Sequence, residues 1–280
     1  MVSRAILVLA LAFAPALAGC LTSESVIRLR ADGSGTIETI FLINEDAMAG
    51  MGNMLGGGSD GDATSASSFA FDAETLQAQA TKYGEGVRLV SSEPMARGPL
   101  KGARMIYAFD DVNALRVEPD PSGLAQSAGP GAGPGNPLDL RLTRQPNGNV
   151  LLSINFQDAP PSSAPAASTP SGPADGFGLD LQDMPPGMEA MIAEMFSGFR
   201  IAMDIEVEGA IVRTSSPFVS GSRVTLIEMD LGTLLKDKAG LARLTDIPPG
   251  AGVADVIPRL KDVQGIKVNE SPLTIEFAAR

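Results

Sequence analysis

The sequence predicts an α+β protein made mostly of antiparallel β-hairpins, with a few short helices. Apolar and polar residues alternate strictly in several short runs, as expected of strands that bury one face. Glycine-containing turns at 32–35 and 146–149 separate such runs, and glycine accepts the positive φ that tight turns need. Helical patterns do not alternate with single strands, so a parallel sheet built from βαβ units is not expected.

Three hairpins account for most of the first half of the chain. They pair 25–31 with 37–43, 87–89 with 103–109, and 138–142 with 150–156. In the last of these, leucine, valine and isoleucine face one side while charged and polar residues face the other. Further strands are predicted at 201–207, 224–231, 266–268 and 273–277.

Helices are predicted between these strands. The segment 44–58 opens with capping residues, and a second helix begins near Asp72 and ends at Gly84. The strongest amphipathic pattern is 188–199, where apolar residues recur with helical period. Two short helices follow, one marked by Leu234, Leu235 and Leu241 and the other by Asp255 and Pro258.

Two stretches rich in Pro, Gly, Ala and Ser lack any apolar period and are predicted to be linkers. They cover 119–137 and 158–186. They leave an N-terminal α+β lobe at 20–118, a β-hairpin at 138–157, and a C-terminal α+β lobe at 187–280. The sequence therefore predicts two lobes, and the hairpin fits with either of them.

Residues 1–19 have the three parts of an export signal peptide. Arg4 supplies the positive charge, 5–14 form the apolar core, and 15–19 provide a cleavage site of small residues before Cys20. The core is too short to span a bilayer, which needs roughly 20 residues. Cys20 is the only cysteine of the chain.

The step Leu17-Ala18-Gly19-Cys20 fits a lipobox. The resemblance to bacterial lipoprotein signals implies a diacylglyceryl thioether on the Cys20 sulfur and an acyl chain such as palmitate on its new amine. Several acyl chains are needed for stable anchoring, because a single acyl chain binds a membrane only marginally. The alternative is an ordinary signal peptide followed by a free thiol.

The residues after Cys20 bear on which membrane carries the anchor. In Gram-negative lipoproteins an aspartate at the next position favours retention in the inner membrane, and here Leu21 and Thr22 follow instead. We therefore expect the inner leaflet of the outer membrane, with the protein facing the periplasm. The inner membrane is the alternative.

Charge and composition limit the partners. Loss of Arg4 with the signal leaves 20 Lys and Arg against 33 Asp and Glu, a balance of −13. Such a charge excludes nucleic acid as a partner and predicts repulsion from anionic lipid head groups, because no basic cluster is visible along the sequence. Histidine is absent, so Ser-His-Asp and Cys-His catalysis and the usual zinc sites cannot be built.

Residues 46–58 are the predicted ligand-contact segment. Its apolar side chains precede a glycine triplet and are Met48, Met51, Met54 and Leu55. A helix of this length does not persist alone in water, so its apolar face must pack on something. It either docks on its own sheet or forms a movable flap over an apolar groove, a use for which adaptable methionines are suited.

The sequence is also compatible with two other functions. A carboxylate-based glycan hydrolase would use Asp110 with Asp111, or Glu206 with Glu208, as its acid pair. However, alternating acids opposite an apolar row are typical of any half-buried strand.

Copper(I) binding would use thioethers on one helical face, namely Met184, Met188, Met191 and Met195. Phenylalanine and isoleucine interleave with these methionines, so core packing is the better interpretation. No metal site, cofactor or catalytic residue is therefore expected.

Several segments together resemble a family of uncharacterised bacterial envelope lipoproteins and, more remotely, LppM-type lipoprotein domains. The matching pieces are ADGSGT at 31–36, YGEGV at 83–87, YAFDDVN at 107–113 and the run 224–235. The resemblance implies an envelope location and the hairpin architecture, and for LppM-type domains contact with lipid or lipoglycan has been suggested. Taken together, we expect a lipid-anchored, non-enzymatic protein that binds an envelope protein or an apolar or lipid ligand.

Overall fold

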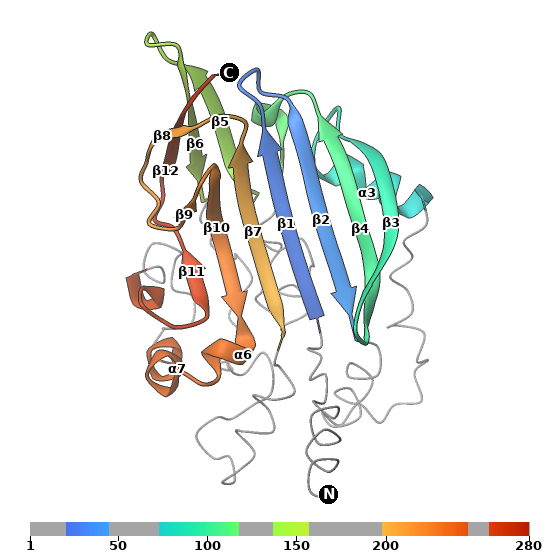
Figure 1. The fold of residues 1–280 in the computed structure, drawn as a ribbon, viewed down its shortest axis with the longest axis vertical. Coiled ribbons are helices and arrows are strands. Elements are labelled where there is room, and N and C mark those ends of the chain that lie inside the picture. Colours follow the sequence, from blue (N-terminus) through green and yellow to red (C-terminus); the bar gives the residue numbers. More distant parts are fainter. Residues whose placement is uncertain (1–20, 45–72, 118–136, 157–197, 246–257, 280) are drawn as a thin grey trace, which may run out of the picture.

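The computed structural model describes residues 21–44, 73–117, 137–156, 198–245 and 258–279. Two β-sheets form the body of the protein (Figure 1). The larger sheet has the strand order β11-β10-β7-β1-β2-β4-β3, with β9 paired to β10, and the smaller sheet has the order β5-β6-β12-β8. This mostly β architecture confirms the predicted predominance of antiparallel strands with a few short helices.

The strands of the larger sheet are β1 (Leu21–Leu29), β2 (Gly35–Ile43), β3 (Arg88–Arg97), β4 (Leu100–Phe109), β7 (Arg200–Val207), β9 (Val219–Ser220), β10 (Arg223–Asp230) and β11 (Ile266–Val268). The smaller sheet contains β5 (Asp139–Arg144), β6 (Asn149–Asn155), β8 (Ile211–Thr214) and β12 (Leu273–Ala278). The helices are α3 (Ala73–Lys82), the 3-10 turn η3 (Val112–Ala114), α6 (Leu231–Leu234) and α7 (Lys238–Thr245).

The three predicted hairpins are confirmed as β1–β2, β3–β4 and β5–β6. In the first turn, the Arg30 amide donates to the Ser34 carbonyl at 2.9 Å, and the Asp32 carboxylate accepts from the Ser34 amide at 2.9 Å. Gly33 has a φ of +95° at this turn, a conformation that glycine adopts without steric cost. The hairpins therefore follow from local pattern and turn chemistry.

The pairing of β1 with β7 was not predicted. These strands run parallel from the Thr22–Arg200 pair to the Leu29–Val207 pair. Residues that the sequence analysis assigned to separate N-terminal and C-terminal lobes thus share one sheet. Alternation along a strand identifies its buried face but not the strand that pairs with it. The sequence pattern therefore suggested two lobes, although strands from both regions lie in one sheet.

The hairpin 138–157 also gains a distant partner. β12, the last strand of the chain, lies between β6 and β8 and pairs with both. β11, only a few residues earlier, instead extends the larger sheet beside β10. The end of the chain therefore contributes one strand to each sheet.

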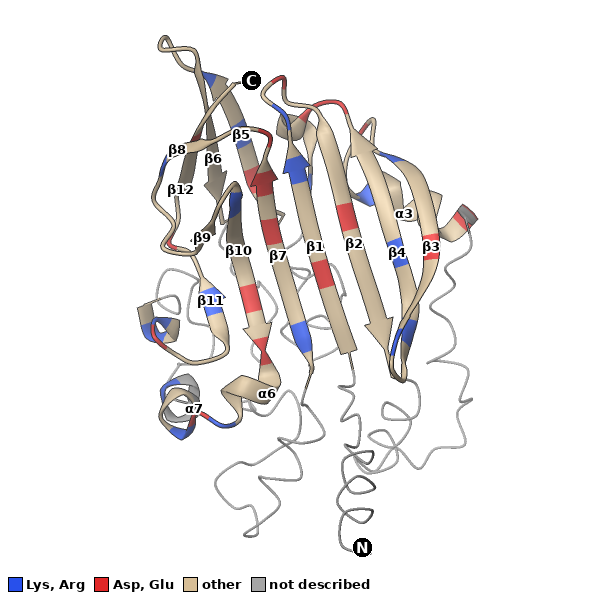
Figure 2. Cartoon of the chain, in the orientation of Figure 1, with Lys and Arg blue, Asp and Glu red and all other residues tan. Residues whose placement is uncertain are grey.

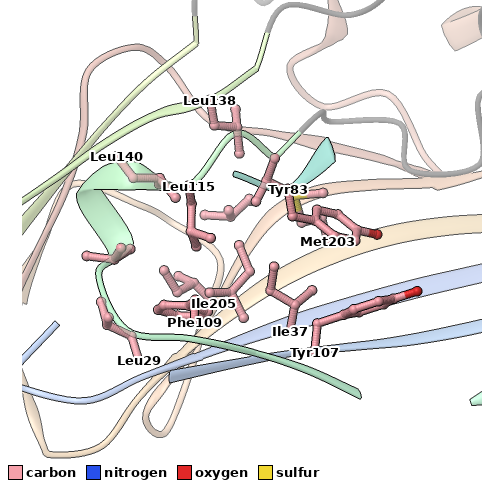
Figure 3. Close-up of a cluster of buried hydrophobic side chains, with 14 of the residues drawn as sticks. Leu29, Ile37, Tyr83, Tyr107, Phe109, Leu115, Leu138, Leu140, Met203 and Ile205 are labelled. Atoms are coloured by element: carbon pink, nitrogen blue, oxygen red, sulfur yellow. The ribbon is translucent and has the colours of Figure 1, made fainter. Parts of the chain in front are cut away.

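A single hydrophobic core joins the two sheets and α3 (Figure 3). Ile37 and Phe109 from the larger sheet belong to the same buried cluster as Leu138 and Leu140 from the region of β5, and all four are nearly inaccessible to solvent. Burying each such side chain stabilises the fold by about 1.5–3 kcal/mol. Because both sheets contribute to this core, neither sheet has a hydrophobic centre of its own.

The helix predicted to begin near Asp72 is confirmed as α3, while the single helix predicted around Leu234 to Leu241 is divided into α6 and α7. The predicted helices at 44–58 and 188–199 and the linkers at 119–137 and 158–186 lie outside the described residues, apart from their ends at 44, 137 and 198–199. In the described part of the chain, no helix combines the length and apolar character needed to cross a membrane.

Candidate functional site

The predicted lipidation site adjoins the described fold directly. Cys20 itself lies outside the described residues, but Leu21 is the first residue of β1 and only 1% exposed. Leu21 pairs with Ile43, the last residue of β2. Consecutive Cα atoms are about 3.8 Å apart, so a lipid on Cys20 would be attached with no spacer to this end of the larger sheet, which we call the anchor end.

The predicted flap residues Met48, Met51, Met54 and Leu55 lie outside the described residues. Their segment follows Asn44 and therefore leaves the sheet from the anchor end, beside the start of β1. Whether it acts as a flap stays a prediction.

The outer face of the larger sheet carries two rows of ion pairs that cross the strands (Figure 2). The first charge row lies near the anchor end and consists of Lys267, Glu228, Arg200, Glu24 and Arg97. Arg200 is central, because its guanidinium reaches Glu24 at 2.6 Å and Glu228 at 2.9 Å. Although burial opposes it, hydrogen bonds from Arg200 and then Lys267 lower the pKa of Glu228.

The second charge row crosses the middle of the same face. It consists of Asp204, Arg223, Glu206, Arg28, Glu38, Arg104 and Glu93. Glu38 is its most buried member and binds both Arg104, at 2.6 Å, and Arg28. The hydrogen bond from Arg104 is the main reason why the pKa of Glu38 lies below its ordinary value.

The four carboxylates considered for catalysis have partners of their own. Glu206 is bound by Arg223 at 2.7 Å and Glu208 by Arg30 at 3.3 Å, while Arg88 binds Asp110 at 3.2 Å. Asp111 caps η3 by accepting from the Asn113 amide.

All four candidate carboxylates are thus engaged, three in ion pairs with arginine and Asp111 in the cap of η3. This geometry favours charge pairing and capping.

A groove of about 680 Å³ lies between the end of α3, the segment after η3 and the start of β5. Its lining includes buried Leu115 and Leu138 and the exposed cations Lys82, Arg116 and Arg141. The acids in the lining are Glu85 and Asp139, and Asp139 is paired with Arg141 at 3.0 Å. Among the described residues, neither Lys82 nor Arg116 has an ion-pair partner.

Hydrogen bonds hold the groove walls together. The Arg116 amide donates to the Tyr83 carbonyl at 2.8 Å, and the side-chain Oδ1 of Asn113 accepts from the Leu142 amide at 2.8 Å. Gly84 is required here, since a Cβ at this position would lie 2.5 Å from the Ala114 carbonyl oxygen. Three separated segments meet at the groove without a shared motif, so sequence reasoning missed it.

The core face of β1 carries hydroxyl groups toward the anchor end. Ser23 is completely buried, and its hydroxyl has no hydrogen-bond partner among the described residues, while the Ser25 hydroxyl lies 3.1 Å from that of Thr39. Tyr107, on β4, has a raised pKa because of burial and the nearby Tyr83. A buried hydroxyl without a partner costs about 1–3 kcal/mol, which marks Ser23 as an unusual core position.

Within the described residues, no group of three or more His, Cys, Asp or Glu side chains is placed to hold a metal ion. The methionines weighed for copper, Met184 to Met195, lie outside this part of the chain. The described methionines Met105 and Met203 are core residues.

Comparison with known proteins assigns no family. No protein-family profile matches the chain, and no curated protein matches it significantly. A solved structure with some similarity is the NMR structure of the Mycobacterium tuberculosis LppM protein folded domain. Its sequence is 11% identical to this chain, and the superposition has a TM-score of 0.33 and covers 93% of this chain and 91% of the LppM domain. No functional conclusion rests on this similarity.

Proposed function

We propose that the protein is a lipid-anchored, non-enzymatic component of the cell envelope that faces the periplasm and binds an envelope protein or an apolar or lipid ligand. The observation that carries the proposal is the single Cys20, which ends a lipobox and directly precedes β1. Leu21 in place of aspartate favours the inner leaflet of the outer membrane.

The groove is our candidate for the partner contact. η3, which precedes it, is bonded to the β1–β2 turn, because the Val112 amide donates to the Gly33 carbonyl at 2.9 Å. This turn is the far end of β1, and a nine-residue strand at about 3.3 Å per residue separates it from the anchor by about 30 Å. The groove would therefore face the periplasm, away from the membrane.

The chemistry of the groove favours a partner with negatively charged groups. Lys82 and Arg116 are exposed, and guanidinium and ammonium groups bind carboxylates and phosphates through charge-assisted hydrogen bonds. Leu115 and Leu138 add an apolar floor. An envelope protein with an acidic segment fits both features.

The anchor is tested with Cys20→Ser. We expect the wild-type protein to be acylated by mass spectrometry and to fractionate with membranes, and the variant to be unacylated and misprocessed or released. In a matched control, Cys20→Ser with Thr22→Cys, the thiol is shifted two residues and should not be acylated. A soluble wild-type protein without lipid would refute the anchor.

The groove is tested by photo-crosslinking in cells from a reactive amino acid at Lys82, with the exposed Val90 on β3 as the control position. We expect a specific adduct from position 82 that is lost in Arg116→Glu. An adduct that is equally strong from position 90, or that survives Arg116→Glu, would remove the groove from the proposal.

A further inference from the structure

We propose that the anchor end of the larger sheet is a docking surface for anionic lipid head groups. The inference deepens the proposed function, since it rests on a lipid at Cys20. Because Leu21 already belongs to β1, acylation of the preceding residue leaves no linker that would let the domain stand off from the membrane. The residues around the start of β1 must then meet the head-group region.

Five exposed cations gather at this end, and we call them the cationic rim. They are Arg97, Lys101, Lys236, Lys238 and Arg243. In Figure 2, blue segments lie at the lower ends of β3 and β4 and around α6 and α7.

The strand register places both parts of the rim beside Leu21. Lys101 pairs with Ile43, which in turn pairs with Leu21. On the other side, Thr22 pairs with Arg200, and Arg200 pairs with Asp230, after which α6 begins. Lys236 and Lys238 follow α6 directly. The rim thus flanks the attachment point on two sides.

Three of the described acids near the anchor end are bound by other groups of the protein. Glu24 is bound by Arg200 and Arg97 in the first charge row. Asp230 caps α6 by accepting from the Thr233 amide, and Asp237 accepts from the amides of Gln264 and Gly240, which lower its pKa. The side chains of Lys101, Lys236 and Lys238 are exposed to solvent.

The described part of the chain is close to neutral, with 19 Lys and Arg against 18 Asp and Glu, so the negative balance comes from residues outside it. Electrostatic interactions between exposed charges are screened beyond about 8–10 Å at physiological salt. Described acids at the far end of β1, such as Asp32 and Asp110, lie about 30 Å from the anchor end. Among the described residues, the cationic rim therefore dominates the local charge at the anchor end, and each cation held at an anionic surface strengthens binding about five-fold.

The test uses the acylated, processed protein in nanodiscs of phosphatidylcholine, with or without 30% phosphatidylglycerol. Since Cys20 is the only cysteine, an introduced cysteine is the only free thiol available for a fluorophore. Ala239→Cys on α7 reports on the rim and Pro146→Cys on the β5–β6 turn reports on the far end. Lipids with a quencher on the head group detect which label lies at the membrane.

We expect phosphatidylglycerol to increase quenching at position 239 and not at 146, and added salt to reverse the increase. The rim variant Lys101→Gln, Lys236→Gln, Lys238→Gln should shift the docked-to-free ratio about 100-fold toward the free state, to the level in phosphatidylcholine alone. The matched control Arg30→Gln, Arg88→Gln, Arg144→Gln removes the same charge at the far end and should keep the wild-type response.

Equal quenching at position 239 in both lipids, or an unchanged response of the rim variant, would overturn the docking surface. Failure of the anchor is a separate result, because a protein without acyl chains does not co-elute with the nanodiscs. The two proposals are therefore distinguished in one experiment.

Discussion

Replacing Ser23 with alanine should stabilise the protein, although most core substitutions destabilise. The Ser23 hydroxyl is fully buried and finds no hydrogen-bond partner in the part of the chain that the structure describes, and a buried hydroxyl without a partner costs about 1–3 kcal/mol. Deleting one oxygen opens roughly 10 Å³, which costs only about 0.2 kcal/mol at 24 cal/mol per Å³. We expect Ser23→Ala to raise the free energy of unfolding by about 1 kcal/mol or more.

Ser25→Ala is the matched control, two residues along the same face of β1. Its hydroxyl is paired with Thr39, so the substitution leaves a buried Thr39 hydroxyl alone and should lower the free energy of unfolding by about 1–2 kcal/mol. The two variants therefore have opposite signs for the same chemical change.

The free energies of unfolding are measured by urea titration of the mature protein, with far-ultraviolet circular dichroism as the signal for loss of the sheets. In a protein of this size, 1 kcal/mol corresponds to about 2–4 °C in Tm. If Ser23→Ala proved less stable than wild type while the slope with urea was unchanged, the Ser23 hydroxyl would have a stabilising partner and the reasoning would be refuted.

Three further predictions concern other parts of the chain. Because the pKa of Glu38 is lowered in the folded state, its ion pairs stabilise the protein above about pH 4.5, and this stabilisation is lost as the pH falls below that value. In Glu38→Gln the free energy of unfolding should therefore fall less steeply with decreasing pH than in wild type. An equally steep fall in both proteins would contradict this. Deleting 160–183 should leave the Tm within a few degrees of wild type, since the segment has little apolar surface to bury; a large drop would mean that it is packed. Titration with copper(I) should show no tight uptake, and uptake that disappears in Met191→Leu with Met195→Leu would reverse the interpretation of these residues as core.

The features that the sequence predicted correctly are local ones. Alternation in 25–31 and 37–43, with a glycine turn between them, determines which residues are buried and how the two strands meet, and both follow from neighbouring residues alone. The same holds for α3, whose apolar Leu76 and Ala80 are spaced to face one side and are both buried.

Features that depend on distant contacts escaped sequence reasoning. The alternation that buries Ile205 is compatible with any neighbour that offers an apolar face, so nothing along the chain indicated β1. The gathering of cations at the anchor end was missed for the same reason. Lys101 and Lys236 are isolated in the sequence, and only the register of the larger sheet brings them to the same end of the protein. The groove likewise requires α3, the segment after η3 and β5 to meet.

The shared sheet leads to a prediction that separates one fold from two lobes. If 20–157 and 187–280 were independent lobes, each would fold when expressed alone. In the structure β1 would lose β7, and its backbone groups from Thr22 to Leu29 would have no partners on that side. The core would also lose Met203, Ile205, Ile275 and Phe277, which are all fully buried.

We therefore expect neither fragment to unfold cooperatively on its own, because an exposed strand edge and a half-empty core favour aggregation. Co-expressed fragments should assemble into a complex that elutes as one species with the circular dichroism of the intact chain. The deletion of 160–183 is the matched control, because it shortens the same connection without cutting it. Cooperative unfolding of either fragment alone would show that the lobes are independent and that the β1–β7 pairing contributes little to stability.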